Sequence, residues 1–377
     1  MNKPNASADS NPANQAGISQ MSKNPVAWFG GFGVVAISLY LLWIGQNILQ
    51  PLFVAAFLVL VLNGIANFLM RIKLFGFSLP YFAAYSLALI LILLGLVMMM
   101  EIIIGNVAKI NDNIGIYQSN LKALIERYSS LFAALELPSF QEFLSQLSLR
   151  SLFTQSVSSV TGITGNIFTV ILFMVFILLE RTSIKGKLHH LAKNTDDEMA
   201  MRHSVAYVSK MLENYIGTKA LVSCVTALCS YGLMLVVGLD YPGFWAMLIF
   251  ILNFIPYIGS LIAILFPISL SVLQFASPFP ILVTAAGLLI IQVSFGNFIE
   301  PRVMGKSLNI SPLVLLLSLA TFGSIWGIVG MVLAVPLTVI AMVISAQYPS
   351  TRLLAIMISA NGAVDHLHKG AAKDVDK

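Results

Sequence analysis

Two stretches decide the fold: residues 243–274, GFWAMLIFILNFIPYIGSLIAILFPISLSVLQ, and residues 311–345, SPLVLLLSLATFGSIWGIVGMVLAVPLTVIAMVIS. As single helices they would be about 48 and 52 Å long, whereas the hydrocarbon core of a bilayer is about 30 Å thick. The first is interrupted by NFIPYIG at 253–259, and the second by GSIWGIVG at 323–330. Each pattern predicts two half-length helical arms joined by a polar or glycine-rich tip.

Both stretches belong to long runs without charged side chains. Of the 377 residues, 58% are apolar and only 10% are charged, whereas about a quarter of the residues in a soluble domain are charged. The uncharged runs are 24–70, 74–100, 151–179, 220–239, 241–299 and 307–351. Because a helix crosses the hydrocarbon in about 20 residues, we predict an all-α, polytopic helical membrane protein. The composition excludes an ordinary cytosolic enzyme, a disordered chain and a coiled-coil rod.

The alternation of apolar runs and charged loops predicts the order of segments. Residues 105–158 regain charges and carry an amphipathic stripe, which indicates a small helical insertion outside the membrane. The polar cluster at 46–51 is expected to fold the first run back on itself. The predicted segments are a disordered tail at 1–25, three transmembrane helices within 26–104, the insertion at 105–158, a fourth helix at 159–180, a cytoplasmic amphipathic linker helix at 181–215, a core at 216–347 and a cytoplasmic tail at 348–377. The core is expected to contain a fifth helix, the hairpin 243–274, the span 279–299 and the hairpin 311–345.

The distribution of basic residues supports hairpins. The loop after residue 180 carries six lysines and arginines, which the positive-inside rule places in the cytoplasm. Arg302 and Lys306 lie on that same side only if both broken segments return to the side they entered. We therefore predict two re-entrant hairpins that open to opposite sides, with both termini cytoplasmic. The net charge of +5 reflects this bias and does not indicate a nucleic-acid partner.

The tips of the hairpins are the candidate binding site, because broken helices leave polar backbone groups at mid-membrane. The candidates are Asn253, Pro256, Tyr257, Gly259 and Ser260 at the first tip, Gln292 and Asn297 in the span, and Thr321, Gly323, Ser324, Trp326 and Gly327 at the second tip. The alternative is that the proline and glycines only kink buried helices. The two amides of the span could equally join helices by hydrogen bonds.

Glu300 is the only acidic residue between Tyr241 and Thr351. A proton- or cation-coupled mechanism would need such a group, although Arg302 and Lys306 follow at once and offer an ion pair. The sequence shows no metal-ligand spacing, no phosphate-binding loop and no catalytic constellation at membrane depth. We expect no metal, no cofactor and no enzymatic activity.

Three motifs resemble the autoinducer-2 exporter family of bacterial membrane proteins, and the similarity extends over about residues 25–347. They are NFIPYIG at 253–259; NFIEPRVMG at 297–305 with Leu308 and Ser311-Pro312-Leu313; and GIVGM at 327–331 with Ala334-Val-Pro336. In this order and spacing the three motifs together are specific.

The resemblance implies an inner-membrane transporter that forms a homopentamer and works by an elevator movement of two helical hairpins. Members of the family are also described as sodium or lithium/proton antiporters. Two hypotheses follow. The first is an exporter of a small polar metabolite, held between the two hairpin tips and the span 279–299. The second is a monovalent cation/proton antiporter that uses Glu300. A third possibility is a scaffold protein whose insertion at 105–158 recruits partners. Substrate, transport direction and coupling ion do not follow from the sequence.

Overall fold

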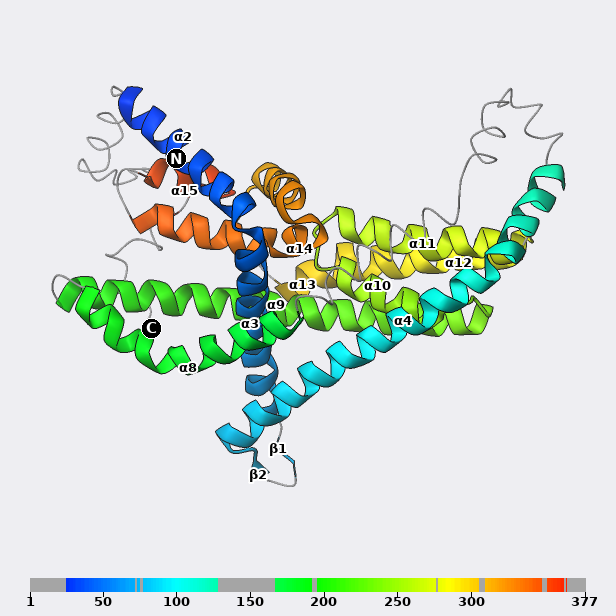
Figure 1. Ribbon diagram of the computed structural model, residues 1–377, viewed down its shortest axis with the longest axis horizontal. Coiled ribbons are helices and arrows are strands. Elements are labelled where there is room, and N and C mark those ends of the chain that lie inside the picture. The colour runs from blue at the N-terminus through cyan, green and yellow to red at the C-terminus, as the bar shows by residue number, and fades with distance from the viewer. Residues whose placement is uncertain are drawn as a thin grey trace, which may run out of the picture. The chain divides into compact units, whose positions relative to one another are not determined.

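The chain is almost entirely helical in the computed structural model, which describes residues 25–71, 73–74, 77–127, 167–191, 195–275, 277–304, 309–347, 351–362 and 364. Within these residues the one sheet is the antiparallel pair β1 (Lys73–Leu74) and β2 (Phe77–Ser78), between two helices (Figure 1). Six described helices are long and apolar enough to cross a membrane. The predicted fold class, an all-α polytopic helical membrane protein, is confirmed.

The helices follow the order of the predicted segments. They are α2 (Pro25–Ile44), α3 (Gln46–Arg71), α4 (Tyr81–Arg127), α8 (Ile167–Leu191), α9 (Thr195–Val237), α10 (Pro242–Leu252), α11 (Ile258–Phe275), α12 (Pro278–Val293), the π-helix η1 (Ser294–Ile299), α13 (Glu300–Met304), α14 (Pro312–Gln347) and α15 (Arg352–Ile358). Their described residues form two compact units. One comprises 1–54, 176–212 and 308–377, and the other comprises 55–175 and 213–307.

The first broken segment is a helical hairpin. Helices α10 and α11 are separated by the turn 253–257, and the two ends of the segment meet at its base. There the Gln274 side chain accepts a hydrogen bond from the Asp240 N–H, at 2.7 Å, and donates one to the Gly238 carbonyl, at 2.8 Å. Between base and tip, the rings of Trp245 and Phe266 stack with centroids 6.2 Å apart. These contacts close the hairpin that the sequence predicts for 243–274.

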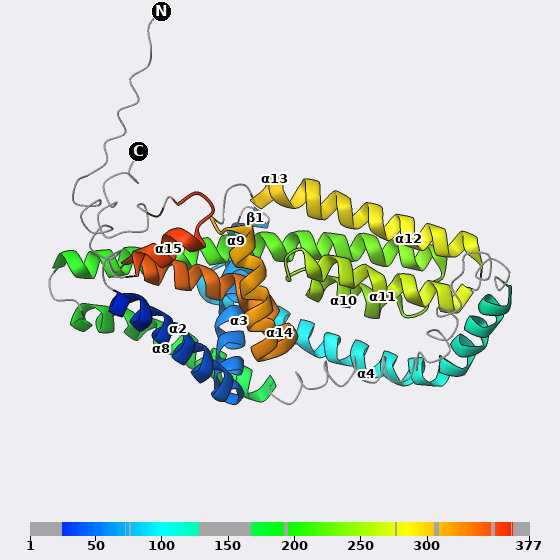
Figure 2. The same cartoon turned by 90° about the horizontal axis from the view of Figure 1, so that it is seen from above.

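The second broken segment also reverses, within α14. Gly327 has φ 62° and ψ −140°, a conformation that glycine adopts without steric strain. A Cβ atom on Gly330 would lie only 1.9 Å from the Phe322 carbonyl oxygen. In a straight helix, residues eight apart in sequence are about 12 Å apart, so the chain reverses between Phe322 and Gly330. The Ser311 N–H at the start of α14 donates to the Ile358 carbonyl at 2.8 Å. The arms of α14 run in different directions from this turn (Figure 2).

The other end of α14 packs on the same short helix. Met342, Val343 and Ala346 form a buried cluster with Ala355 of α15 and with Val364. Both ends of the hairpin 311–345 therefore lie close to α15 and the residues that follow it. The hairpin part of the predicted fold class is thus confirmed at both positions.

Several helices are longer than the segments predicted from hydropathy. Helix α4 continues to Arg127 and includes the first part of the predicted insertion, whereas 128–158 lies outside the described residues. Helices α8 and α9 cover most of the predicted linker 181–215, apart from 192–194. A change from apolar to charged side chains moves a helix from lipid into water, but it does not interrupt the backbone hydrogen bonds.

The junction of α2 and α3 differs from the predicted reversal at 46–51. The Gly45 N–H donates to Leu41 O at 2.8 Å, and the Leu49 N–H donates to Gly45 O at 2.8 Å. The helical pattern of hydrogen bonds therefore continues across Gly45, and the junction is a bend. Amide side chains tolerate a continuous helix, so polar residues alone were a weak sign of a turn. The sidedness of the termini stays a prediction.

Gly259 offers a direct test of the first hairpin. Its added Cβ would lie 2.0 Å from the Leu252 carbonyl oxygen and 2.6 Å from the Ile255 Cβ. We expect Gly259→Ala to lower the free energy of unfolding in detergent by about 2 kcal/mol or more, since overpacking against backbone costs about 1–3 kcal/mol. Gly217→Ala in α9, which meets nothing within 4 Å, is the matched control and should be neutral or slightly stabilising. Equal stability of the two variants would contradict the tight turn.

Candidate functional site

The tip of the first hairpin contains a buried amide, that of Asn253. Asn253 follows the last residue of α10, and its N–H lies within hydrogen-bonding reach of the Ile249 and Ile251 carbonyls. Its side chain is 5% exposed and accepts a hydrogen bond from Gln292 Nε2 of α12 at 3.2 Å. Phe254, the next residue, packs edge-on against Phe57 of α3. Two predicted site residues, Asn253 and Gln292, are thus brought into contact.

Gln292 retains a free acceptor. Its Oε1 atom is buried and has no hydrogen-bond partner among the described residues. Directly after it, residues 294–299 form the π-helix η1, a wider turn that is rare in proteins and frequent at functional sites. A buried amide oxygen without a partner is costly, so this atom is suited to accept a hydrogen bond from water or from a solute.

The exposed face of the first tip carries the other candidates. Tyr257 has φ 61°, an uncommon conformation for a residue with a side chain, and its side chain is 60% exposed. Ser260 donates to the Tyr257 carbonyl at 3.2 Å. Asn297, by contrast, is exposed in η1 and does not join the pair of Asn253 and Gln292.

Lys219 of α9 and Glu300 of α13 form an ion pair. The sequence pattern had indicated Glu300 but not Lys219. Lys219 Nζ of α9 contacts Glu300 Oε1 of α13, and the side chains are 6% and 21% exposed. Both residues lie within helices that qualify as membrane spans. The signal was available: Leu212, Tyr215 and Ile216 define the buried face of α9, and position 219 continues that face. A lysine there needs an acidic partner.

The second tip belongs to the other unit and is held by its tryptophan. Trp326 is 5% exposed, donates from its ring N–H to the Leu42 carbonyl at 3.1 Å, and lies 5.6 Å from the Phe53 ring. The Ser324 hydroxyl donates to carbonyls of its own helix, at Ala320 and Thr321. A Cβ on Gly323 would meet Met331 at 2.9 Å, so this glycine permits a close approach. A pocket between the two tips stays a prediction.

The base of the first hairpin is anchored by a polar stripe on α4, outside its apolar portion Tyr81–Ile102. The Tyr117 hydroxyl donates to Asp240 Oδ2 at 2.8 Å, and Asn120 Nδ2 donates to the Leu273 carbonyl at 2.9 Å. Burial raises the pKa of Tyr117 above its ordinary value, and the contacts with Tyr241 and Asp240 add to this shift. The phenol therefore stays protonated and donates.

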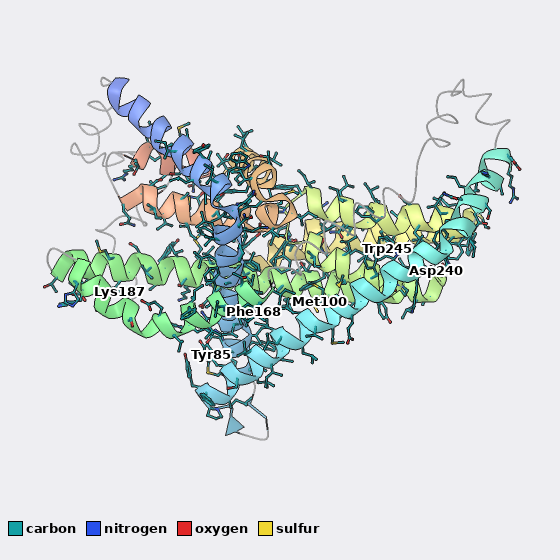
Figure 3. The ribbon with its side chains drawn as sticks, viewed as in Figure 1. Tyr85, Met100, Phe168, Lys187, Asp240 and Trp245 are labelled. Carbon is teal, nitrogen blue, oxygen red and sulfur yellow. The ribbon has the colours of Figure 1, made fainter. Side chains whose placement is uncertain are left out.

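Asp240 also connects the base to the rest of the hairpin. The Trp245 ring N–H donates to the Asp240 carbonyl at 3.2 Å, and both residues are labelled beside α4 in Figure 3. The base is therefore fixed to α4, whereas the tip makes its contacts with α3 and α12. This arrangement positions Asn253 against Gln292. No group of three or more potential metal-ligating side chains gathers in the part of the chain that the structure describes.

Comparison with known proteins identifies the family. The family model described as "AI-2E family transporter" matches residues 32–350. The chain belongs to the AI-2E transporter family. As a member of this family it is a multi-pass bacterial membrane transporter and not an enzyme.

Several relatives in this family cover almost the whole chain. The chain is 26% identical to the AI-2 transport protein TqsA of Escherichia coli K12, over 87% of this chain and 94% of the relative. It is 27% identical to a putative transport protein of Haemophilus influenzae over the same shares. It is 26% identical to the putative transport protein YhhT of Escherichia coli K12, over 83% of this chain and 88% of the relative. The resemblance derived from the three motifs is confirmed.

Substitutions at the buried ion pair test its energetics. We expect Glu300→Gln to lower the free energy of unfolding by about 3–5 kcal/mol, because it leaves the buried Lys219 ammonium without its partner. Lys219→Met should lower it less, because the Glu300 carboxylate that it leaves is 21% exposed. The double variant should lose much less than the sum of the two, measured by denaturation of the full chain in detergent.

The control is the exposed pair of Lys187 and Glu180, whose side chains are 64% and 53% exposed. Lys187→Met should change the stability by only about 0–1 kcal/mol. Additive effects of Lys219→Met and Glu300→Gln would contradict the buried pair.

Proposed function

We propose that this AI-2E family member is a secondary transporter that exports a small, polar, uncharged metabolite. The observation that carries the proposal is the polar contact of Asn253 and Gln292 inside a membrane protein, with one buried amide oxygen left to accept a hydrogen bond. The relative TqsA is described as an AI-2 transport protein, so autoinducer-2 is the first substrate to test.

The proposed contacts lie at the tip of the first hairpin and on α12. Asn253 and Gln292 are the inner contacts, Pro256 and Tyr257 belong to the turn, and Gly259 and Ser260 belong to the first turn of α11. Asn297 and the second-tip residues Thr321, Gly323, Ser324, Trp326 and Gly327 remain candidates from the sequence. An uncharged solute fits these contacts, because the described charges nearest to Gln292 in sequence, Glu300 with its partner Lys219, neutralise each other.

The elevator movement and the homopentamer are parts of the same proposal. The first hairpin has the parts that a moving element needs: a closed base, a short turn at its tip and a strained residue, Tyr257, within that turn. Chemical cross-linking in membranes would measure the number of subunits. The proposed location is the bacterial inner membrane.

Uptake into inverted membrane vesicles tests the transport function. Vesicles with the wild-type chain should accumulate autoinducer-2 in the presence of an energised membrane. We expect Asn253→Leu and Gln292→Leu to reduce the initial rate about tenfold, the effect of losing roughly 1.4 kcal/mol of hydrogen bonding in the transport cycle.

Ser269→Ala is the matched control, because this hydroxyl of α11 is exposed and donates to the Leu265 carbonyl of its own helix. The rate of this variant should equal that of the wild type. Wild-type vesicles that take up no more autoinducer-2 than empty vesicles would refute the proposed substrate. Full activity of Asn253→Leu would refute the site.

The second candidate function is a monovalent cation/proton antiporter, and the pair of Lys219 and Glu300 favours it. A carboxylate that already binds an ammonium group inside the membrane is suited to exchange that partner for a proton or a small cation. Sodium or lithium added to acidified inverted vesicles should then dissipate the pH gradient, measured by fluorescence dequenching.

Under this second function Glu300→Gln should abolish the dequenching, because the neutral amide neither binds a cation strongly nor releases a proton. Glu180→Gln at the exposed pair is the control and should leave the dequenching unchanged. A silent wild type, or an undiminished response of Glu300→Gln, would remove this candidate.

A further inference from the structure

Among the residues that the structure describes, two residues other than glycine have a left-handed backbone, and both belong to the first hairpin. Tyr241, directly before α10, has φ 58°, and Tyr257, in the turn after α10, has φ 61°. This conformation is strained for a residue with a side chain, and it persists only where the surrounding structure holds it. Strained residues are frequent at clamps and switches. The helix that leads to Asn253 is thus bounded by strain at both ends.

The local sequence does not favour the conformation of Tyr241. Pro242 follows it at the start of α10, and a proline ring favours an extended backbone for the residue before it. The observed left-handed form, with φ 58° and ψ 43°, therefore competes with an extended form. A change from one form to the other alters the direction in which α10 leaves residue 241.

Helix α4 holds the ring of Tyr241. The Tyr241 hydroxyl accepts a hydrogen bond from Asn113 Nδ2 at 2.6 Å and donates one to the Lys109 carbonyl at 3.0 Å. The net gain from two hydrogen bonds is of the same order as the strain of one left-handed residue. The two forms of Tyr241 are therefore close in free energy, and the contact with α4 selects the left-handed form.

Both ends of the hairpin meet α4 at the base. Next to Tyr241 in sequence, Asp240 accepts a hydrogen bond from the Tyr117 hydroxyl at 2.8 Å. Near the end of α11, the Leu273 carbonyl accepts one from Asn120 Nδ2 at 2.9 Å. The base is therefore a pivot that rests on α4.

The tip is held less firmly than the base. Among the described residues the Asn253 side chain has one hydrogen bond, from Gln292 Nε2, and its length of 3.2 Å is at the long end of the usual range. Residue 253 lies about 18 Å along the helix from residue 241, so a rotation of about 20° at the base moves the tip by about 6 Å. The stacked rings of Trp245 and Phe266 keep the two arms together. A small change at the base thus separates Asn253 from Gln292.

We propose that Tyr241 is the hinge of the first hairpin and that α4 keeps this hinge closed through Asn113. While the Tyr241 ring is bound, α10 directs Asn253 to Gln292. Release of the ring lets Tyr241 adopt the extended form, and the tip opens. This inference rests on the proposed transport function for its purpose, which is to admit and release the solute at the pair of Asn253 and Gln292. Tyr241 and Asn113 are positioning residues, because they act on that pair through α10.

The rate at which a maleimide labels a cysteine at position 253 measures the opening. Asn253→Cys is introduced into the full-length chain with Cys224→Ala and Cys229→Ala, and labelling is followed in detergent. Residue 253 is 5% exposed, so labelling of this parent chain should be slow. Tyr241→Phe and Asn113→Leu should each accelerate the labelling about tenfold, because each removes a hydrogen bond that holds the ring.

Three further variants distinguish a hinge from a loosened fold. Pro242→Ala removes the preference for the extended form, so it should slow the labelling about threefold. Tyr231→Phe is the matched control, because it removes a hydroxyl from a tyrosine of α9 that is 37% exposed and takes no part in the base. Met234→Cys, at a position that is 0% exposed, reports global unfolding and should stay unlabelled in every variant.

The outcomes separate the hinge from the proposed function, because the labelling needs no solute. Unchanged labelling of Tyr241→Phe and Asn113→Leu overturns the hinge. Labelling of Pro242→Ala that is not slowed, or equal acceleration at Met234→Cys, also overturns it. Uptake of autoinducer-2 by the wild type, together with unchanged labelling, leaves the transporter and removes the hinge. The expected labelling without any uptake leaves the hinge and removes the proposed substrate.

Discussion

A helix that reverses inside a membrane protein must satisfy the backbone groups that the reversal releases, and this constraint governs the hairpin α10–α11. Within the turn, the Phe254 N–H donates to Ile251 O, the Ile255 N–H to Leu252 O and the Ile258 N–H to Pro256 O. Because Gly259 has no Cβ atom, the Leu252 carbonyl oxygen can occupy the space that a side chain at position 259 would fill. The turn is thus closed by short-range hydrogen bonds, and the side chain of Asn253 remains available for Gln292.

The position of the tip follows from the base. Gln274 closes the hairpin against residues 238–240, and Tyr117 and Asn120 fix this base to α4. Helix α4 is 47 residues long, about 70 Å, so one continuous helix joins its apolar portion Tyr81–Ile102 to the residues Tyr117 and Asn120 that contact the base of the hairpin.

The polar side chains of the interior differ in whether a hydrogen bond or an ion pair satisfies them. Hydroxyl groups such as those of Thr226 and Thr338 bond to their own helix and need nothing else. The ion pair of Lys219 and Glu300 satisfies itself across two helices, and its two side chains hold α9 and α13 in register. Among the described residues, Ser223, Ser230 and Gln292 carry buried side-chain atoms without a hydrogen-bond partner.

The sequence by itself determined the membrane character, the order of the helices and the two broken segments, because hydropathy, segment length and proline or glycine interruptions are local properties. It also identified Asn253, Gln292 and Glu300 as polar groups where apolar ones are expected. It placed the ends of α4, α8 and α9 less well, since a helix continues through a change in polarity. Only the tertiary structure decided which polar groups meet. Asn253 and Gln292 are 39 residues apart, and Lys219 and Glu300 are 81 apart. Such pairs depend on the register between packed helices, which no local pattern specifies.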